Sequence, residues 1–202
     1  MSSFWDQNYS QAEGYKYGET PNAFLVQEAH RLARPGCVLV PGDGEGRNGV
    51  WLAEQGFEVH TLDGSGVGVA KARALAERRG VSLDAQQVDL AEWEPAPAGF
   101  TGAAIIYLHL PPALRVAVHH KVVRALQPGG ILILETFHPR QLEFHSGGPK
   151  DPDMLYTLDM LRADFADGME ELLEQECDTT LTEGAGHEGH AFVTRWIGRR
   201  LA

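Results

Sequence analysis

The chain has 202 residues, of which 43% are hydrophobic, and a formal net charge of −11. This length suits one domain with a single core, and the acidic balance excludes the basic surface that nucleic acid or an anionic membrane requires. Two cysteines without a CxxC pair favour a reducing compartment, and no apolar run reaches membrane-spanning length. We therefore expect a cytoplasmic protein, without a membrane or nucleic-acid partner, that acts on a small molecule.

The first 34 residues combine an aromatic segment with a short helix. Thr20-Pro21 predicts where that helix begins. The stretch before it shows neither a strand nor a helix period, yet it is crowded by Trp5, Tyr9, Tyr15 and Tyr17. These rings are too numerous for a solvated tail, so we expect them to pack on the rest of the chain.

From position 35, short runs of Val, Ile and Leu alternate with helical patterns, which is typical of βαβ units. Strands are predicted at 37–41, 57–62, 83–88, 103–108 and 131–137, and Pro112 begins a helix that ends before a turn at 127–130. Several of these strands are too uniformly apolar for a sheet with one wet face. We expect a parallel sheet covered on both sides.

The C-terminal part follows a different pattern. A loop after position 137 leads to a short predicted helix at 158–165 and then to two strand-like runs, 170–181 and 190–201, joined by a glycine-rich turn. The two runs predict an antiparallel pair. The fold predicted for residues 1–202 is therefore a single α/β domain, a Rossmann-like doubly wound sheet that is mostly parallel with an antiparallel C-terminal edge strand.

A glycine-rich loop follows the first predicted strand, in the stretch VLVPGDGEGRNGVWLA at 38–53. Its GEGRNG string, with Asp63 19 positions after the string's first glycine, matches the dinucleotide fingerprint and supports an NAD(P)-dependent oxidoreductase as an alternative function. That fingerprint requires its first glycine directly at the strand end, which is Gly42 here. Asp43 and Glu45 also add negative charge where a pyrophosphate would lie, so a ligand without phosphate, or with a positive charge, fits better.

This loop resembles motif I of the class I S-adenosylmethionine-dependent methyltransferases, whose cofactor carries a sulfonium and an ammonium but no phosphate. VHTLDGS, QQVDLAEW and LQPGGILILETF resemble the second, third and fifth strand regions of that family, so the resemblance covers nearly the whole chain. GEGRN and the N-terminal YKYGETPN are similar to the tellurite-resistance and thiopurine-methyltransferase-like branch. Many members carry an acid at the position of Val40, which leaves Asp43 or Glu45 as candidates for its role.

The resemblance implies S-adenosylmethionine as cofactor, S-adenosylhomocysteine as product, and a small acceptor such as a thiol, a chalcogen or metalloid oxyanion, or an amine. A non-catalytic cofactor-binding protein is a further alternative. Residues 1–34 would form a lid over the cofactor. The residues that the resemblance assigns to cofactor binding are Gly42, Asp43, Gly44, Glu45, Gly46, Arg47, Asn48, Asp63, Gly64, Ser65, Asp89, Leu90, Tyr107, Leu108, Tyr17 and Trp5.

Some of these assignments compete with structural roles. Asp63 would accept hydrogen bonds from the ribose hydroxyls, and Asp89 with Leu90 would contact adenine, but Asp89 also suits a helix N-cap. Ser65 equally suits the start of the next helix. Arg47 and its neighbour Asn48 would either reach the cofactor's carboxylate or hold the loop.

His109, in the HLPP stretch after the fourth strand, is the catalytic candidate. The resemblance implies that the transferable methyl lies there, and a histidine with a reference pKa of about 6.5 is suited to accept a proton from the acceptor. The alternative is that His109 only orders the loop or the bound cofactor, and a thiolate acceptor needs no base.

Four residues in the loops above the fifth strand and at the terminal hairpin are predicted to line a substrate pocket, namely His138, Arg140, His145 and His187. The chain has nine histidines, but it contains no HExxH, CxxC or ligand quartet of usual spacing, so no metal is predicted. The oligomeric state has no signature in the sequence.

Overall fold

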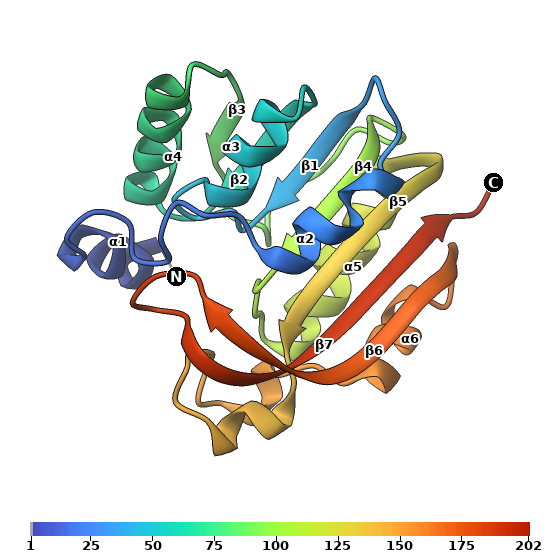
Figure 1. Cartoon of the computed structure of the whole chain (residues 1–202). Coiled ribbons are helices and arrows are strands. Elements are labelled where there is room, and N and C mark those ends of the chain that lie inside the picture. Colours follow the sequence, from blue (N-terminus) through green and yellow to red (C-terminus); the bar gives the residue numbers. More distant parts are fainter. Residues whose placement is uncertain (1) are drawn as a thin grey trace.

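The structure is a computed structural model that describes residues 2–202. Its centre is a seven-stranded sheet with the strand order β3-β2-β1-β4-β5-β7-β6 (Figure 1). The parallel part consists of β1 (Cys37–Pro41), β2 (Glu58–Asp63), β3 (Asp84–Gln87), β4 (Phe100–Ile106) and β5 (Leu126–Phe137). The antiparallel part consists of β7 (Glu188–Arg200) and β6 (Met169–Thr182). The predicted fold class is confirmed.

Helices cover both faces of the sheet, because alternate residues of its apolar strands point to opposite sides. Val38 and Val40 of β1 pack in one core with α2 (Ala23–Glu28) and α3 (Arg47–Glu54). Leu39, between them, packs in a second core with α5 (Pro112–Ala125) and α6 (Leu158–Phe165). The 14-residue α4 (Gly66–Arg79) lies against α3, β2 and β3.

Side-chain caps fix where several helices begin. Asn22, the residue directly after the predicted Thr20-Pro21 start, accepts a hydrogen bond from the backbone N–H of Leu25 and caps α2. Thr157 caps α6 in the same way, and α6 occupies the predicted residues. These caps satisfy backbone donors that have no partner within the helix.

The boundaries of β4 and β5 differ most from the prediction. β4 ends at Ile106, because Tyr107 adopts a positive φ of 52° that is incompatible with an extended strand. β5 begins at Leu126, directly after α5, and includes the predicted turn at 127–130 because Leu126 pairs with Phe100 of β4. Three short 3-10 helices occupy Ala29–Arg31, Pro139–Glu143 and Pro152–Met154.

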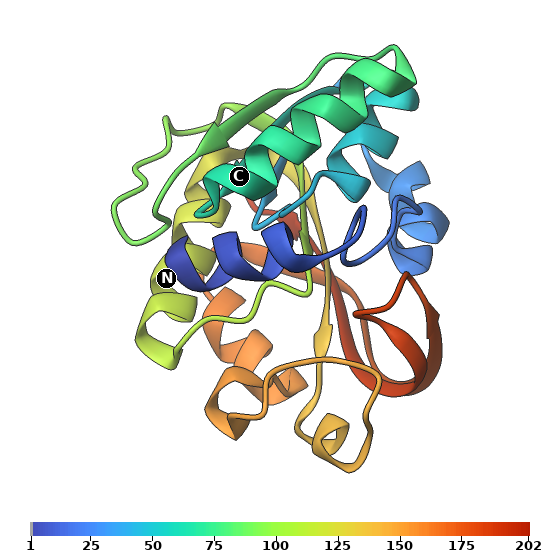
Figure 2. The ribbon, with the colours of Figure 1, turned by 90° about the vertical axis from the view of Figure 1, so that its left-hand side faces the viewer.

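The prediction that the N-terminal segment is irregular is wrong for its first part. Ser2–Gln11 form a helix, α1, which lies beside α4 (Figure 2). The Asp6 carboxylate accepts hydrogen bonds from Ser65 Oγ at 2.5 Å and from the Val67 N–H at 3.3 Å. Contacts with the start of α4 therefore stabilise α1, whose own sequence has little helical pattern.

The order of the last two strands differs from the prediction that the C-terminal strand forms the edge of the sheet. β6 and β7 form the predicted antiparallel pair, but the second strand, β7, inserts between β5 and β6. The edge of the sheet is thus β6. Across residues 2–202, none of the helices combines the length and the apolar character needed to cross a membrane.

Candidate active site

A cavity of about 870 Å³ opens at the carboxyl ends of β1, β2, β3 and β4, next to α1. Ligands bind at this end of the strands in doubly wound sheets. The lining includes every residue that the sequence assigns to cofactor binding except Gly46 and Ser65, and it also includes His109. The structure therefore brings together side chains that are up to about a hundred positions apart in the sequence.

The glycine loop after β1 follows a path that only small residues allow. Gly44 has φ +60°, and a Cβ added to it would lie 2.6 Å from the hydroxyl of Tyr9. Gly46 has φ +90°, and its Cβ would lie 2.6 Å from the Cβ of Ala72 on α4. Gly46 is therefore required for close packing of the loop on α4 and does not line the cavity.

Asp43 and Asp63 are buried acids whose hydrogen bonds come from the backbone. Asp63 accepts from the N–H of Gly44 at 2.9 Å and of Ser65 at 2.8 Å, and Asp43 accepts from the N–H of Gly49 at 3.1 Å. Burial raises the pKa of Asp43 to about 8, with a further contribution from Asp63, whose own pKa is also raised by burial. The ion pairs at this loop bind other acids, and within the described residues none reaches Asp43 or Asp63.

Glu45 has a different role from the other two acids of the site. Its carboxylate accepts from Lys71 Nζ and from the Lys16 N–H, both at 2.7 Å. Lys71 also donates to the backbone oxygens of Tyr9 at 2.6 Å and Gly14 at 2.7 Å. Glu45 and Lys71 thus fasten the N-terminal segment, which contributes to the lining of the cavity.

Arg47 and Asn48 also bind protein groups. Arg47 donates to the Glu183 carboxylate at 2.9 Å, at the turn between β6 and β7, and Asn48 Oδ1 accepts from the Asn22 N–H at 2.9 Å. Glu183 is buried, and its pKa is lowered by hydrogen bonds and charge from His187 and Arg47 in spite of its burial. These contacts correspond to the second sequence interpretation, in which the pair holds the loop.

The sequence analysis did not identify another buried acid, Glu135 of β5, which lies behind the cavity lining and binds Tyr107. It accepts hydrogen bonds from the Tyr107 hydroxyl and from Asn22 Nδ2, both at 2.7 Å, and it pairs with Arg195 at 2.5 Å. A charged residue inside the otherwise apolar run ILILETF is a signal that such a partner set exists. The network holds Tyr107 in its strained backbone conformation beside the cavity.

His109 lies half-buried at the inner wall of the cavity. Its Nδ1 is 2.6 Å from the backbone oxygen of Met154, which assigns the proton to Nδ1 and leaves a lone pair on Nε2. Burial lowers the pKa of His109 to about 4. The imidazole is therefore neutral at pH 7 and a weak base.

Asp89 and Ser65 both take part in local capping. Asp89 lines the cavity, and its carboxylate also accepts from the Ala91 N–H at 2.9 Å, so it caps a single turn and not a helix. Ser65 caps α4 by accepting from the Gly68 N–H at 3.0 Å. Ser65 therefore begins the helix α4, which was the alternative considered for it, and it does not line the cavity.

Comparison with known proteins agrees with this architecture. Residues 38–130 match a family model described as a methyltransferase domain. A solved structure described as "Conversion of a Disulfide Bond into a Thioacetal Group during Echinomycin Biosynthesis" superposes with a TM-score of 0.78 at 22% identity, covering 100% of this chain and 92% of that one. A SAM dependent methyltransferase from Aquifex aeolicus gives 0.68 at 13% identity, covering 100% and 99%. The chain has the class I methyltransferase fold.

One curated protein similar to this chain is a tRNA 5-carboxymethoxyuridine methyltransferase from Escherichia coli (strain K12). It is 30% identical over an alignment of 141 residues that covers 66% of this chain and 54% of the relative. The chain thus spans about half the length of the curated relatives it matches.

The structure brings only part of the predicted substrate pocket to this cavity. Only His187 of its four residues lines the cavity among the residues described. His138 pairs with Glu176 at 3.4 Å, and the Arg140 guanidinium lies 3.9 Å from the centre of the Phe192 ring, because the 3-10 helix at Pro139–Glu143 packs against β7. His145 is likewise absent from the lining. The following loop instead contributes Gly148, Pro149, Lys150, Asp151 and Met154.

Proposed function

We propose that this chain is an S-adenosylmethionine-dependent methyltransferase that methylates a small nucleophile. The observation that carries the proposal is the pair of buried acids, Asp43 and Asp63, which face a cavity of a methyltransferase domain without a cationic partner among the described residues. A buried carboxylate is stabilised when a ligand brings a positive charge to it. The sulfonium and ammonium of this cofactor are such charges, whereas a pyrophosphate would be repelled, which argues against the oxidoreductase alternative.

The residues of the cavity fit the parts of this cofactor. Asp63, at the end of β2, would hold the ribose hydroxyls, and Asp89 with Leu90 would hold the adenine. Trp5 and Tyr17, in the segment fastened by Lys71, would close over it and exclude water. When bound, the cofactor supplies an activated methyl group on its sulfonium. The contribution of the chain is to align donor and acceptor.

We propose a thiol or another soft anion as the acceptor. His109, with a pKa of about 4, is a poor general base at neutral pH. A thiol, with a reference pKa of about 8.5, ionises in water without strong assistance. The inner wall of the cavity also includes the apolar side chains of Leu110, Leu114 and Met154. The similarity to the tellurite-resistance and thiopurine branch supports the same class, as does the disulfide-to-thioacetal conversion described for the neighbouring structure.

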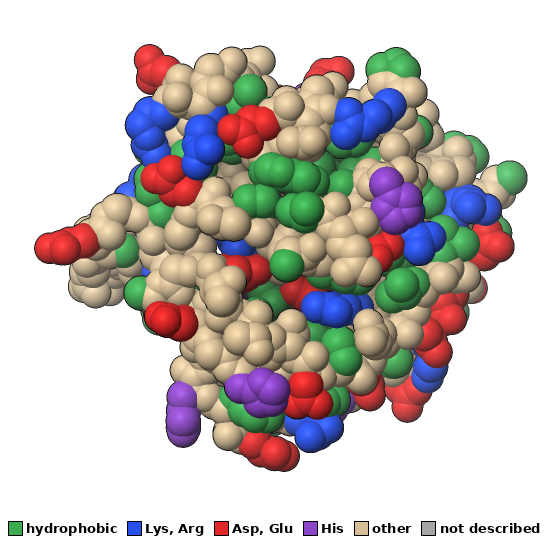
Figure 3. Space-filling model, viewed as in Figure 1, with side chains coloured by type: hydrophobic (Ala, Val, Ile, Leu, Met, Phe, Trp, Pro, Cys, Tyr) green, Lys and Arg blue, Asp and Glu red, His purple; other side chains and the backbone are tan. Residues whose placement is uncertain are grey.

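A tRNA acceptor is the second candidate, because the curated relative acts on tRNA. The charge of the chain argues against it. The net charge is −11, and Figure 3 shows Lys and Arg side chains scattered in small groups among acidic ones on the face it displays. A tRNA-binding surface requires clustered positive charge. The free, half-buried Cys37 and Cys177 fit the cytoplasmic location that we propose with this function.

A thermal-shift experiment tests the cofactor. At 100 times Kd, a ligand of the native state adds about 2.7 kcal/mol, which raises the melting temperature of a domain this size by about 5 to 10 °C. We expect S-adenosylmethionine and S-adenosylhomocysteine to produce this shift in the wild type and in the exposed-acid control Glu92→Ala, and much less in Asp63→Ala. A shift with NAD(P) alone would overturn the proposal.

An acceptor panel tests the substrate class. Formation of S-adenosylhomocysteine is measured with thiols, chalcogen oxyanions, amines and total tRNA at equal ionic strength. We expect thiols or chalcogen anions to be methylated and tRNA to remain unmodified. Methylation of tRNA alone would replace the small acceptor by the second candidate.

A further inference from the structure

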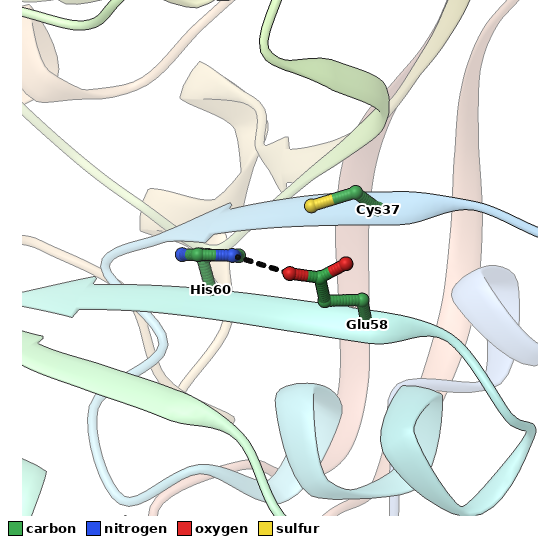
Figure 4. A group of neighbouring side chains, drawn as sticks. All are labelled: Cys37, Glu58 and His60. Carbon is green, nitrogen blue, oxygen red and sulfur yellow. Dashed lines mark hydrogen bonds and ion pairs between the residues drawn. The ribbon is translucent and has the colours of Figure 1, made fainter.

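Three side chains with metal-binding atoms converge at the end of the sheet opposite the cavity (Figure 4). Cys37 begins β1, and Glu58 and His60 lie two positions apart on β2, so they point to the same face. The parallel register pairs Cys37 with Glu58 and Leu39 with His60, which places the three side chains next to one another. One ligand atom of each lies within 4.8 Å of the others.

His60 lies between two carboxylates, with Asp84 Oδ2 3.1 Å from its Nδ1 and Glu58 Oε1 3.4 Å from its Nε2 (Figure 4). A metal ion placed between Nε2 and Glu58 would be bound by the lone pairs of both, while Asp84 would accept the proton on Nδ1. A carboxylate on the outer nitrogen is also the usual support of a metal-bound histidine.

The surroundings admit such an ion. Within the described residues, the only basic group within 4 Å of Glu58 or Asp84 is His60 itself, so the cluster carries excess negative charge. The Glu58 side chain is 73% exposed and free to move by about an ångström, which is the adjustment that tetrahedral bonds of about 2.0 to 2.3 Å require. A hollow lined in part by Cys37 and Glu58 connects the cluster with solvent.

The structure assigns a Zn²⁺-binding site to Cys37, Glu58 and His60, with Asp84 orienting His60. Sulfur, nitrogen and oxygen donors together are typical ligands of Zn²⁺, whereas Mg²⁺ and Ca²⁺ select oxygen alone. Three protein ligands leave the fourth position for water. The site joins the starts of β1 and β2 and is remote from the cavity, so we expect it to stabilise the sheet and to leave cofactor binding unchanged. Motif spacing could not reveal it, because strand pairing brings the ligands together.

The test uses the full chain, freed of metal by a chelator and titrated with Co²⁺, which occupies zinc-type sites and reports sulfur ligation by a thiolate-to-cobalt absorption band. We expect the band to saturate at about one equivalent and to disappear when Zn²⁺ is added. It should be absent in Cys37→Ser and His60→Gln. It should persist in the matched controls Cys177→Ser, which removes the other half-buried thiol, and His190→Gln, which removes another histidine paired with an acid.

Two further variants test the metal site even if Cys37→Ser or His60→Gln folds poorly. Glu58→Gln changes only an exposed side chain and should weaken Co²⁺ binding, and Asp84→Asn should weaken it by about 10- to 100-fold through the orientation of His60. A wild-type chain with no thiolate-to-cobalt band would show that the three side chains form an ion-pair cluster only. A band that survives in Cys37→Ser would also overturn the assignment.

Discussion

Replacing Asp43 by asparagine tests whether the buried carboxyl of the glycine loop is neutral in the ligand-free protein. Asp43 is 8% exposed, and burial raises its pKa to about 8 from an ordinary value of 3.8. Asparagine has the shape of the protonated acid, and its side-chain oxygen can still accept from the Gly49 N–H. The variant therefore imitates the neutral state of Asp43 at every pH.

The sign and size of the effect follow from proton linkage. Because the folded-state pKa lies above the unfolded one, the native state binds the extra proton between about pH 4 and pH 8, and the free energy of unfolding falls as pH rises through this window. Each pH unit corresponds to about 1.36 kcal/mol, so the wild type should lose about 2.7 kcal/mol relative to Asp43→Asn between pH 5 and pH 7. Groups that do not interact with Asp43 contribute equally to both proteins and cancel, whereas Asp63, whose charge contributes to the raised pKa of Asp43, is part of the measured difference.

The assay is urea unfolding of both proteins at pH 5, 6, 7 and 8 without ligand, with Glu92→Gln as an exposed-charge control. Parallel stability curves for wild type and Asp43→Asn would refute the reasoning, because they would mean that Asp43 is already ionised without a ligand.

Binding of S-adenosylmethionine provides a second readout on the same residue. A cationic ligand lowers the pKa of Asp43, so affinity should rise with pH by up to about tenfold per unit below pH 8, with release of a proton. Calorimetry in buffers of different ionisation enthalpy measures that proton. Asp43→Asn should bind about ten- to a hundredfold more weakly at pH 8 and release none.

Three other residues give sharp predictions. Asp63→Ala should weaken S-adenosylmethionine binding by about ten- to a hundredfold in a folded protein, since a charged acceptor is lost, and unchanged affinity by calorimetry would remove Asp63 from the site. His109→Gln should lower kcat by about tenfold and equally across acceptors of different pKa, because a base with a pKa of about 4 contributes little proton transfer, and a loss that grows with acceptor pKa would contradict this. Lys71→Met keeps the apolar stem but removes the ammonium that joins Tyr9, Gly14 and Glu45, so amide hydrogen exchange in residues 2–14 should speed up by about tenfold. Unchanged exchange there, with the exposed Arg73→Met of the same helix as control, would show that the N-terminal segment is held by other contacts.

Local patterns in the sequence determined much of the fold. The predicted β1 and α6 match the structure residue for residue, because β1 is a short apolar run that ends at Pro41 and the glycine loop, and Thr157 caps α6. The parallel sheet with two covered faces follows from apolar strands that cannot expose either side. The glycine loop follows β1 and Asp63 ends β2, so both lie at the edge where the carboxyl ends of the parallel strands meet.

Only the tertiary structure decided which distant residues meet. α1 forms where α4 supplies partners such as Ser65, and β7 lies inside the sheet because it pairs with β5 as well as with β6. Arg47 turns to Glu183, 136 positions away, and Cys37 meets His60 through strand register. Each of these contacts depends on strand order or on the direction in which a loop leaves the sheet. These properties arise from the packing of the whole chain, so no local period or motif spacing records them.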